Sequence, residues 1–239
     1  MKKFIIDADT GSDDAVAILL ALQDPSIEIL GISVVSGNVP LQQGIKNTIS
    51  TIDMTGKKVK VFAGAEKPLT REYEEVYVLD KFMEHVKSLK SSSASGQCVH
   101  GIDGMGDIGI KPSTEEYEEK NAIDFIIDTV NENPSEITLV TLGPLTNIAL
   151  AIQKDSSLSK KIKHCYVMGG TSDGTGNVSA AAEYNIWVDP EAAKICFDSG
   201  MKITMVGWDN SYKYAMLKEE EIEDLRSLKS KLADFSVDI

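Results

Sequence analysis

The chain has 239 residues, of which 42% are hydrophobic and 26% charged, and its formal net charge is −13 at pH 7. This length and composition allow a buried core without disulfide or metal support, and no apolar run approaches the roughly 18–20 residues that a membrane span needs. The excess of 37 acidic over 24 basic residues argues against nucleic acid or an anionic membrane as a partner, because both are bound mainly through Lys and Arg. A small-molecule ligand is left open.

The cysteines and the first residues indicate the compartment. Cys98, Cys165 and Cys196 are odd in number and widely spaced, which predicts neither a disulfide framework nor a zinc site. Only three apolar residues, 4–6, follow the basic start before Asp7, too few for the apolar core of a secretion signal. The sequence therefore predicts a cytoplasmic protein.

Short apolar runs alternate with longer amphipathic segments along the chain. Strands are predicted over residues 4–6, 27–35, 59–62, 137–142, 162–168 and 203–206. Helices are predicted over residues 15–22 (with Ser12 as N-cap), 41–54, 120–131, 145–153, 190–198 and 216–233. Such alternation favours an α/β fold with an open, mainly parallel sheet and helices on both faces. No linker or repeat divides the chain, so residues 1–239 are predicted to form a single domain.

An acidic turn, residues 7–14, follows the first predicted strand and opens the next helix. Its four carboxylates are Asp7, Asp9, Asp13 and Asp14, and no Lys or Arg occurs over residues 4–45. Carboxylates packed together repel and raise one another's pKa. A hard divalent cation is the natural compensator, because Ca²⁺ and Mg²⁺ prefer carboxylate oxygens. The simpler alternative is a solvated acidic turn that caps the helix.

Two enzyme classes share parts of this turn. Residues 9–12 match the aspartic-protease signature Asp-Thr-Gly-Ser, but that chemistry needs a second such carboxylate on β-rich lobes, and the sequence has no second copy. A haloacid-dehalogenase-like phosphatase would use Asp7 as nucleophile, Asp9 as acid and Ser36 to bind phosphate. That hypothesis leaves Asp13 and Asp14 unexplained, so it is kept only as an alternative.

Polar and glycine-rich motifs recur farther along the chain. Asn38 follows the second predicted strand, which places its amide at the same carboxyl edge of the sheet as the acidic turn. Glu183 and Asn185 are two residues apart, so in an extended segment they project to one face. A carboxylate and an amide side by side suit the hydroxyl groups of a sugar.

Together the motifs resemble the inosine-uridine-type nucleoside hydrolase family, in the family's order and over most of the chain. The resemblance is carried by DADTGSDDA (7–15), VVSGN (34–38), FAGAEKPL (62–69), HGIDGMGD (100–107), ITLVTLGPLTNIALA (137–151), VMGG (167–170) and AEYNIWVDPEAA (182–193). It implies calcium-dependent hydrolysis of the N-glycosidic bond of a small-molecule ribonucleoside, and a homo-oligomer, either a dimer or a tetramer.

The resemblance also implies a role for individual residues. Asp9 would bind calcium and act as general base toward the attacking water, and Asp14 would be the second calcium carboxylate. The backbone carbonyl of Leu142 would face the metal. The positions that match ribose-binding residues of the family are Asp13, Asn38, Asn177, Glu183 and Asn185, and Met168 matches a residue that lines the sugar pocket.

One family feature is missing. Family chains normally continue for several tens of residues to a His-Asp pair whose Asp completes the calcium shell, and this sequence contains no His-Asp dipeptide. We therefore expect a domain that is incomplete at its C-terminus, with hydrolysis that truncation can impair. The alternative is a non-catalytic remnant that binds metal or ribose. His100 is the one histidine expected near the site.

Overall fold

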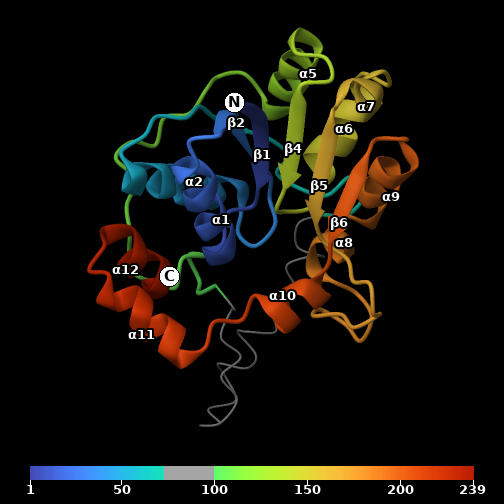
Figure 1. Cartoon of the computed structure of the whole chain (residues 1–239). Coiled ribbons are helices and arrows are strands. Elements are labelled where there is room, and N and C mark those ends of the chain that lie inside the picture. Colours follow the sequence, from blue (N-terminus) through green and yellow to red (C-terminus); the bar gives the residue numbers. More distant parts are fainter. Residues whose placement is uncertain (73–99) are drawn as a thin grey trace.

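The computed structural model describes residues 1–72 and 100–239, and its centre is one six-stranded sheet (Figure 1). Cys98 lies outside the described residues. The strands run in the order β3-β2-β1-β4-β5-β6, and every neighbouring pair is parallel. They are β1 (Lys2–Ala8), β2 (Ile27–Val34), β3 (Val61–Ala63), β4 (Ile137–Thr141), β5 (His164–Met168) and β6 (Ile203–Val206).

Helices cover both faces of this sheet, which confirms the predicted fold class. The helices are α1 (Ser12–Gln23), α2 (Leu41–Thr55), α5 (Ala122–Glu132), α6 (Thr146–Lys154), α7 (Leu158–Lys161), α8 (Tyr184–Val188), α9 (Pro190–Asp198), α10 (Trp208–Tyr214), α11 (Glu219–Ser227) and α12 (Lys231–Asp238). α1 and α2 pack together on one face, while α5, α6 and α9 lie on the other (Figure 1).

The core consists of two apolar layers separated by the sheet. Successive side chains of β1 alternate between them: Ile5 belongs to the layer under α5, α6 and α9, and Ile6 to the layer under α1 and α2. Both side chains are almost completely buried. Because strands covered on both faces must be apolar throughout, they appear in the sequence as continuous hydrophobic runs.

The strand order places a topological switch point at β1. β1 pairs with β2 on one side and with β4 on the other, so the chain builds outward first in one direction and then in the other. Open parallel sheets bind ligands outside the carboxyl ends of the strands at such a switch point. In this chain the acidic turn follows the carboxyl end of β1.

Three local predictions need correction. The N-cap of α1 is Gly11 rather than Ser12, because the Asp14 carboxylate accepts a hydrogen bond from the Gly11 N–H at 2.8 Å. The helix predicted over 216–233 is two helices, α11 and α12, separated by Lys229, whose φ of 49° is left-handed and cannot continue a helix. Residues 184–188 form α8 instead of an extended segment.

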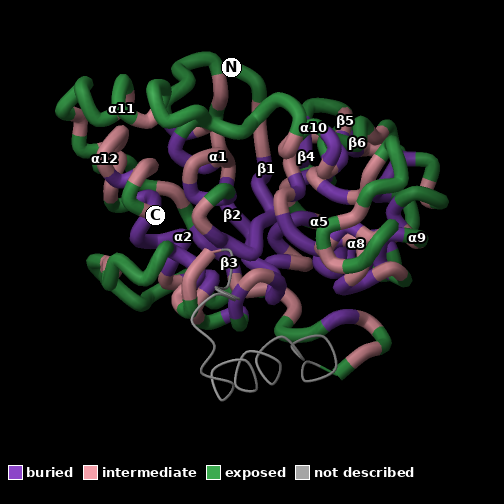
Figure 2. Tube along the Cα trace, turned by 90° about the horizontal axis from the view of Figure 1, so that it is seen from below, coloured by how far each residue is buried: buried purple, intermediate pink, exposed green. Residues whose placement is uncertain are grey.

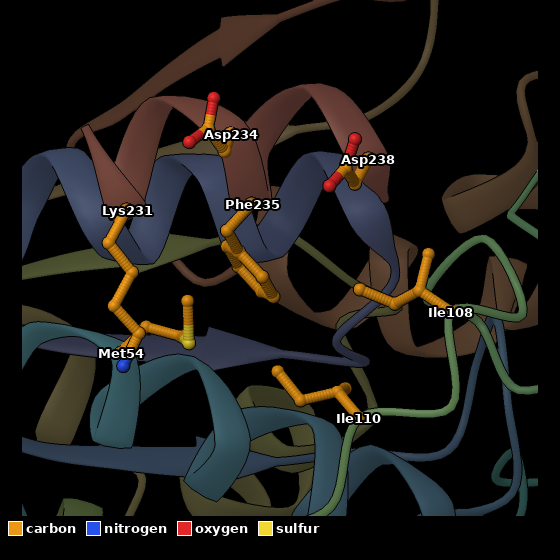
Figure 3. Close-up of a pocket in the computed structure, with 7 residues that line it drawn as sticks. All are labelled: Met54, Ile108, Ile110, Lys231, Asp234, Phe235 and Asp238. Atoms are coloured by element: carbon orange, nitrogen blue, oxygen red, sulfur yellow. The ribbon is translucent and has the colours of Figure 1, made fainter. Parts of the chain in front are cut away.

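The C-terminal helix packs beside the acidic turn's helix. Phe235 of α12 is buried in a small cluster with Ala15 and Leu19 of α1 and with Met105 of the 100–107 loop. A shallow cavity beside this cluster is lined by Met54, Ile108, Ile110, Lys231, Asp234, Phe235 and Asp238 (Figure 3). By contrast, α11 has no buried residue and lies at the surface (Figure 2). None of the helices described is long and apolar enough to cross a membrane.

Candidate active site

Asp9, the first residue after β1, is the most buried carboxylate of the acidic turn. Its Oδ2 accepts a hydrogen bond from the Asn38 backbone N–H at 2.5 Å. Its Oδ1 is buried and has no hydrogen-bond partner among the described residues. Burial raises the pKa of Asp9 to about 7, and the charge of Asp13 adds to the increase. A raised pKa of this kind suits a proton acceptor.

Asp14 lies next to Asp9 and completes a pair of buried carboxyl groups. Its Oδ2 accepts from the Gly11 N–H at 2.8 Å and from the Asn38 amide at 3.4 Å. Burial raises the pKa of Asp14, and the charges of Asp9 and Asp13 raise it further. Two buried carboxylates side by side disfavour each other's ionisation, so a bound cation would stabilise the charged form of the pair.

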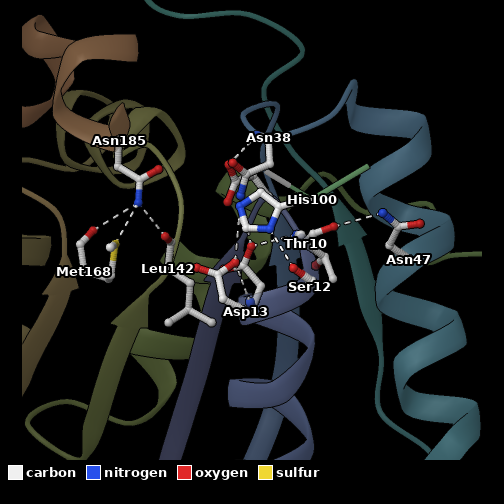
Figure 4. Close-up of polar contacts among 12 residues, drawn as sticks. Thr10, Ser12, Asp13, Asn38, Asn47, His100, Leu142, Met168 and Asn185 are labelled. Atoms are coloured by element: carbon white, nitrogen blue, oxygen red, sulfur yellow. Dashed lines mark hydrogen bonds and ion pairs between the residues drawn. The ribbon is translucent and has the colours of Figure 1, made fainter. Parts of the chain in front are cut away.

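Exposed Asp13 and half-buried His100 form the rim of the same turn (Figure 4). His100 Nδ1 is 2.6 Å from the Ser12 hydroxyl oxygen, and its Nε2 is 3.8 Å from Asp13 Oδ1. Gly11 lies beneath the ring, where a Cβ would stand 3.2 Å from His100 Cγ. The structure thus brings His100 against the acidic turn, as expected from the sequence.

On the other side of the switch point, three predicted site residues meet. The Asn185 side-chain amide donates to the Leu142 carbonyl at 2.6 Å, and its nitrogen lies 3.3 Å from the Met168 carbonyl and 3.2 Å from the Met168 sulfur (Figure 4). Leu142 and Met168 stand at the carboxyl ends of β4 and β5. One amide therefore joins two strand ends and holds the carbonyl that was predicted to face a metal.

The other two predicted sugar-binding residues hold the backbone. The Glu183 carboxylate is the N-cap of α8: Oε1 accepts from the Asn185 N–H at 2.9 Å, and Oε2 from the Gly170 N–H at 2.8 Å and the Ile186 N–H at 3.2 Å. Burial raises its pKa. Asn177 Oδ1 accepts from the Tyr184 N–H at 2.8 Å. Both side chains were predicted to contact substrate, and in the structure both accept hydrogen bonds from nearby backbone N–H groups.

Two asparagines that support the site were missed by the sequence analysis. Asn147 of α6 donates to Asp7 and accepts from the Ala65 N–H, below the acidic turn. Asn47 of α2 donates to the Thr10 carbonyl at 2.9 Å (Figure 4). It also donates to the Asp103 carbonyl at 2.8 Å. A signal for Asn47 existed, because the buried side of α2 carries an uncommon polar set: Asn47, Thr48, Ser50 and Thr51.

The donor set fits a hard cation in part. The described residues hold no group of three or more His, Cys, Asp or Glu side chains that could bind a metal. They do hold the Asp9–Asp14 pair, whose burial and mutual repulsion leave negative charge uncompensated, and the free Asp9 Oδ1. Oxygen donors of this kind suit Ca²⁺ or Mg²⁺. With the Leu142 carbonyl they are the residues that could hold such an ion.

The fold is a parallel α/β sheet with a buried carboxylate pair at its switch point, flanked by amides, and such switch points are where open sheets of this class bind ligands. The model of the family "Inosine-uridine preferring nucleoside hydrolase" matches residues 4–239, so the chain belongs to this family. Since the family is that of nucleoside hydrolases, the phosphatase alternative is dropped.

Individual relatives and solved structures agree with this family. The chain is 38% identical to Uridine nucleosidase 1 of Arabidopsis thaliana over 96% of its length. It is 36% identical to the pyrimidine-specific ribonucleoside hydrolase RihB of Escherichia coli (strain SE11) over 87% of its length. A solved purine-preferring ribonucleoside hydrolase from Gardnerella vaginalis superposes with a TM-score of 0.86 and 36% identity, covering 99% of this chain and 70% of that one. The chain spans only 63% and 60% of the plant and bacterial relatives, respectively.

Proposed function

We propose that this chain hydrolyses the N-glycosidic bond of ribonucleosides to free base and ribose, with calcium as cofactor. The observation that carries the proposal is the buried pair of Asp9 and Asp14 at the switch point, in which Asp9 Oδ1 has no hydrogen-bond partner among the described residues. When bound there, calcium supplies positive charge that polarises a water molecule. A cytoplasmic location and a dimer or tetramer stay predictions.

The residues of the chain divide the remaining work. Asp9 accepts the proton of the attacking water, for which its raised pKa is suited. Asp13 and Asp14 favour the positive charge that develops on the ribose as the glycosidic bond breaks. The amides of Asn38 and Asn185 stand on the two sides of the pair, where they can hold the sugar hydroxyls in a fixed orientation. Met168 supplies an apolar wall beside Asn185.

The base class is left to experiment, because the printed names of the relatives include uridine, pyrimidine-specific and purine-preferring enzymes. Release of ribose should be measured from inosine, from uridine and from p-nitrophenyl riboside, each with calcium and with EGTA. The aryl riboside needs little protonation of its leaving group, so it reports on the water-activating side alone. Asp9→Asn should abolish turnover of all three substrates, whereas Asp224→Asn on the exposed helix α11 should leave it unchanged.

The alternative is a protein that binds metal or ribose without turnover. Its support is that Glu183 and Asn177 already use their side chains as backbone caps. Calorimetric titration with calcium, and then with ribose, tests this alternative directly. Binding without turnover of any of the three substrates would favour it. Absence of turnover at saturating calcium would contradict the hydrolase proposal for this chain.

A further inference from the structure

Tyr184, the first residue of α8, connects the two sides of the site. Its hydroxyl donates a hydrogen bond of 2.8 Å to the carbonyl of Gly37, a residue 147 positions earlier in the loop after β2. Its backbone N–H is held by Asn177 Oδ1 at 2.8 Å. The backbone of Tyr184 is therefore held by the segment between β5 and α8, and its hydroxyl is held by the loop that carries Asn38.

The Gly37 carbonyl belongs to the same peptide unit as the Asn38 N–H. That N–H donates to Asp9 Oδ2 at 2.5 Å. Because a peptide unit is planar, fixing the direction of its carbonyl also fixes the direction of its N–H. A hydrogen bond donated to the carbonyl also polarises the unit and strengthens the bond that its N–H donates.

Gly37 cannot contribute a side chain of its own to this arrangement. A Cβ at Gly37 would stand 1.9 Å from Asp9 Oδ2 and 2.5 Å from Asp9 Cγ, well inside van der Waals contact. The close approach of this backbone to the carboxylate requires glycine, and glycine brings conformational freedom to the peptide. The Gly37 N–H donates to the Val39 carbonyl at 3.2 Å within the loop, and the Tyr184 hydroxyl adds a restraint from another segment at the Gly37 carbonyl.

We propose that Tyr184 is a positioning residue for Asp9 and acts through the Gly37–Asn38 peptide. The phenol of Tyr184 orients the Gly37–Asn38 peptide, and the Asn38 N–H of that peptide holds Asp9 Oδ2. Asp9 Oδ1 is then left to accept the proton of the attacking water. We call the hydrogen bonds from Tyr184 to Gly37 and from Asn38 to Asp9 the relay. The effect of the relay on catalysis rests on the proposed function, whereas the existence of the relay does not.

The test is Tyr184→Phe, which removes one oxygen atom and keeps the ring. The matched control is Tyr214→Phe, at a tyrosine that is 82% exposed. In amide NMR spectra of the full chain, the Asn38 N–H proton of Y184F should move upfield, as expected for a weaker hydrogen bond, and the control should not move it. Resonances of residues in β4 and β5 that overlay with the wild type would show that the fold is kept.

Kinetics give the second measurement. Loss of one neutral hydrogen bond is worth about 0.5–1.5 kcal/mol, so kcat should fall about 2- to 12-fold at nearly constant KM. A rise in KM at unchanged kcat would mean that the hydroxyl contacts substrate, and would overturn the positioning role. An unmoved Asn38 resonance would overturn the relay even in an active enzyme. Wild-type protein without turnover but with the expected NMR shift would contradict the proposed function and support the relay.

Discussion

The side-chain amide of Asn147 donates a hydrogen bond of 2.8 Å to Asp7 Oδ1, joining α6 to β1 directly below the acidic turn. The same nitrogen lies 3.2 Å from the Val34 carbonyl, and Asn147 Oδ1 accepts from the Ala65 N–H at 2.8 Å. One buried side chain thus fixes the carboxyl ends of β1 and β2 and the loop after β3. The positions of Asp9 and Asn38 depend on those strand ends.

Replacement of this asparagine should be costly. Asn147→Ala leaves the Ala65 N–H without its side-chain acceptor and leaves Asp7 with the Ser33 hydroxyl in place of two side-chain donors, so the free energy of unfolding should fall by about 1–3 kcal/mol in urea titrations. Asn131→Ala is the control, because Asn131 makes its hydrogen bonds to Asp155 and Lys161 at the surface, and it should stay within about 0.5 kcal/mol of wild type. Equal losses in the two variants would contradict the central role of Asn147.

Stability of the metal-free chain should depend on pH in an unusual direction. Burial raises the pKa values of Asp7 and Asp9 to about 7, so the folded chain binds more protons than the unfolded chain between about pH 4 and about pH 7. In EGTA the free energy of unfolding should therefore fall as the pH rises through this window, and then level off. Surface carboxyls whose pKa is lowered, such as Asp155 at about 2, change the free energy of unfolding only below this pH window.

Asp7→Asn removes one of the buried carboxyl groups whose pKa is raised and should flatten this decline. Urea midpoints measured in EGTA across about pH 5 to about pH 8 give the comparison. Added calcium should reverse the trend in the wild type, because ligand carboxyls must lose their protons to bind metal. Wild-type stability in EGTA that increases across this range would contradict the prediction.

The two cysteines described in the core should resist modification. Burial raises the pKa of the Cys165 thiol to about 12 and also raises the pKa of Cys196. Since the thiolate is the reactive form, iodoacetamide should label both slowly near neutral pH. The measurement uses Cys98→Ser, so that mass spectrometry counts only Cys165 and Cys196, with urea-unfolded protein as the positive control. Fast labelling without urea would show that the β5–α9 layer opens readily.

Glu183 should show separable effects on stability and activity. Glu183→Ala removes the acceptors for three backbone N–H groups at the start of α8, with an expected cost of about 0.5–2 kcal/mol. Glu183→Gln keeps one acceptor oxygen and should lose less stability. If the carboxylate also binds ribose, both variants should raise KM for uridine. A raised KM in Glu183→Ala alone would mean that the cap is its only task.

The C-terminal helix should stabilise the 100–107 loop from behind. Phe235→Ala creates a cavity beside Met105 and should cost about 3–5 kcal/mol. Hydrogen exchange should then increase in residues 100–110 before it does in β4. Leu228→Ala is the control, because Leu228 is 65% exposed and its truncation should change little. Unchanged exchange in this loop would mean that it holds its shape without α12.

The features that the sequence could predict depend on local pattern. Apolar runs marked the strands, and parallel strands bring their carboxyl ends to one edge, so Asp9, Asp14 and Asn38 were expected to lie together. The split between α11 and α12 was missed because Ile222, Leu225, Leu228 and Leu232 keep helical spacing across a break, although Ser230 offered an N-cap signal.

The contacts that could not be predicted join distant segments. Tyr184 and Gly37 are 147 residues apart, and Asn147 and Asp7 are 140 apart. Periodicity assigns a residue to a face of its own element, but it does not tell which loop crosses to meet it. The extended geometry expected at 183–185 was wrong for a related reason: Glu183 uses its carboxylate to start a helical turn, which the two-residue spacing alone did not reveal.

The position of Ile239 has a practical consequence for handling the protein. A Cβ at Gly106, in the loop that carries His100, would stand 2.6 Å from the Ile239 carbonyl oxygen. An affinity tag joined to Ile239 would emerge beside the loop that carries His100, at the rim of the candidate site. Met1 is 84% exposed and precedes the amino end of β1, at the opposite edge of the sheet. Tags and surface immobilisation are best placed at Met1.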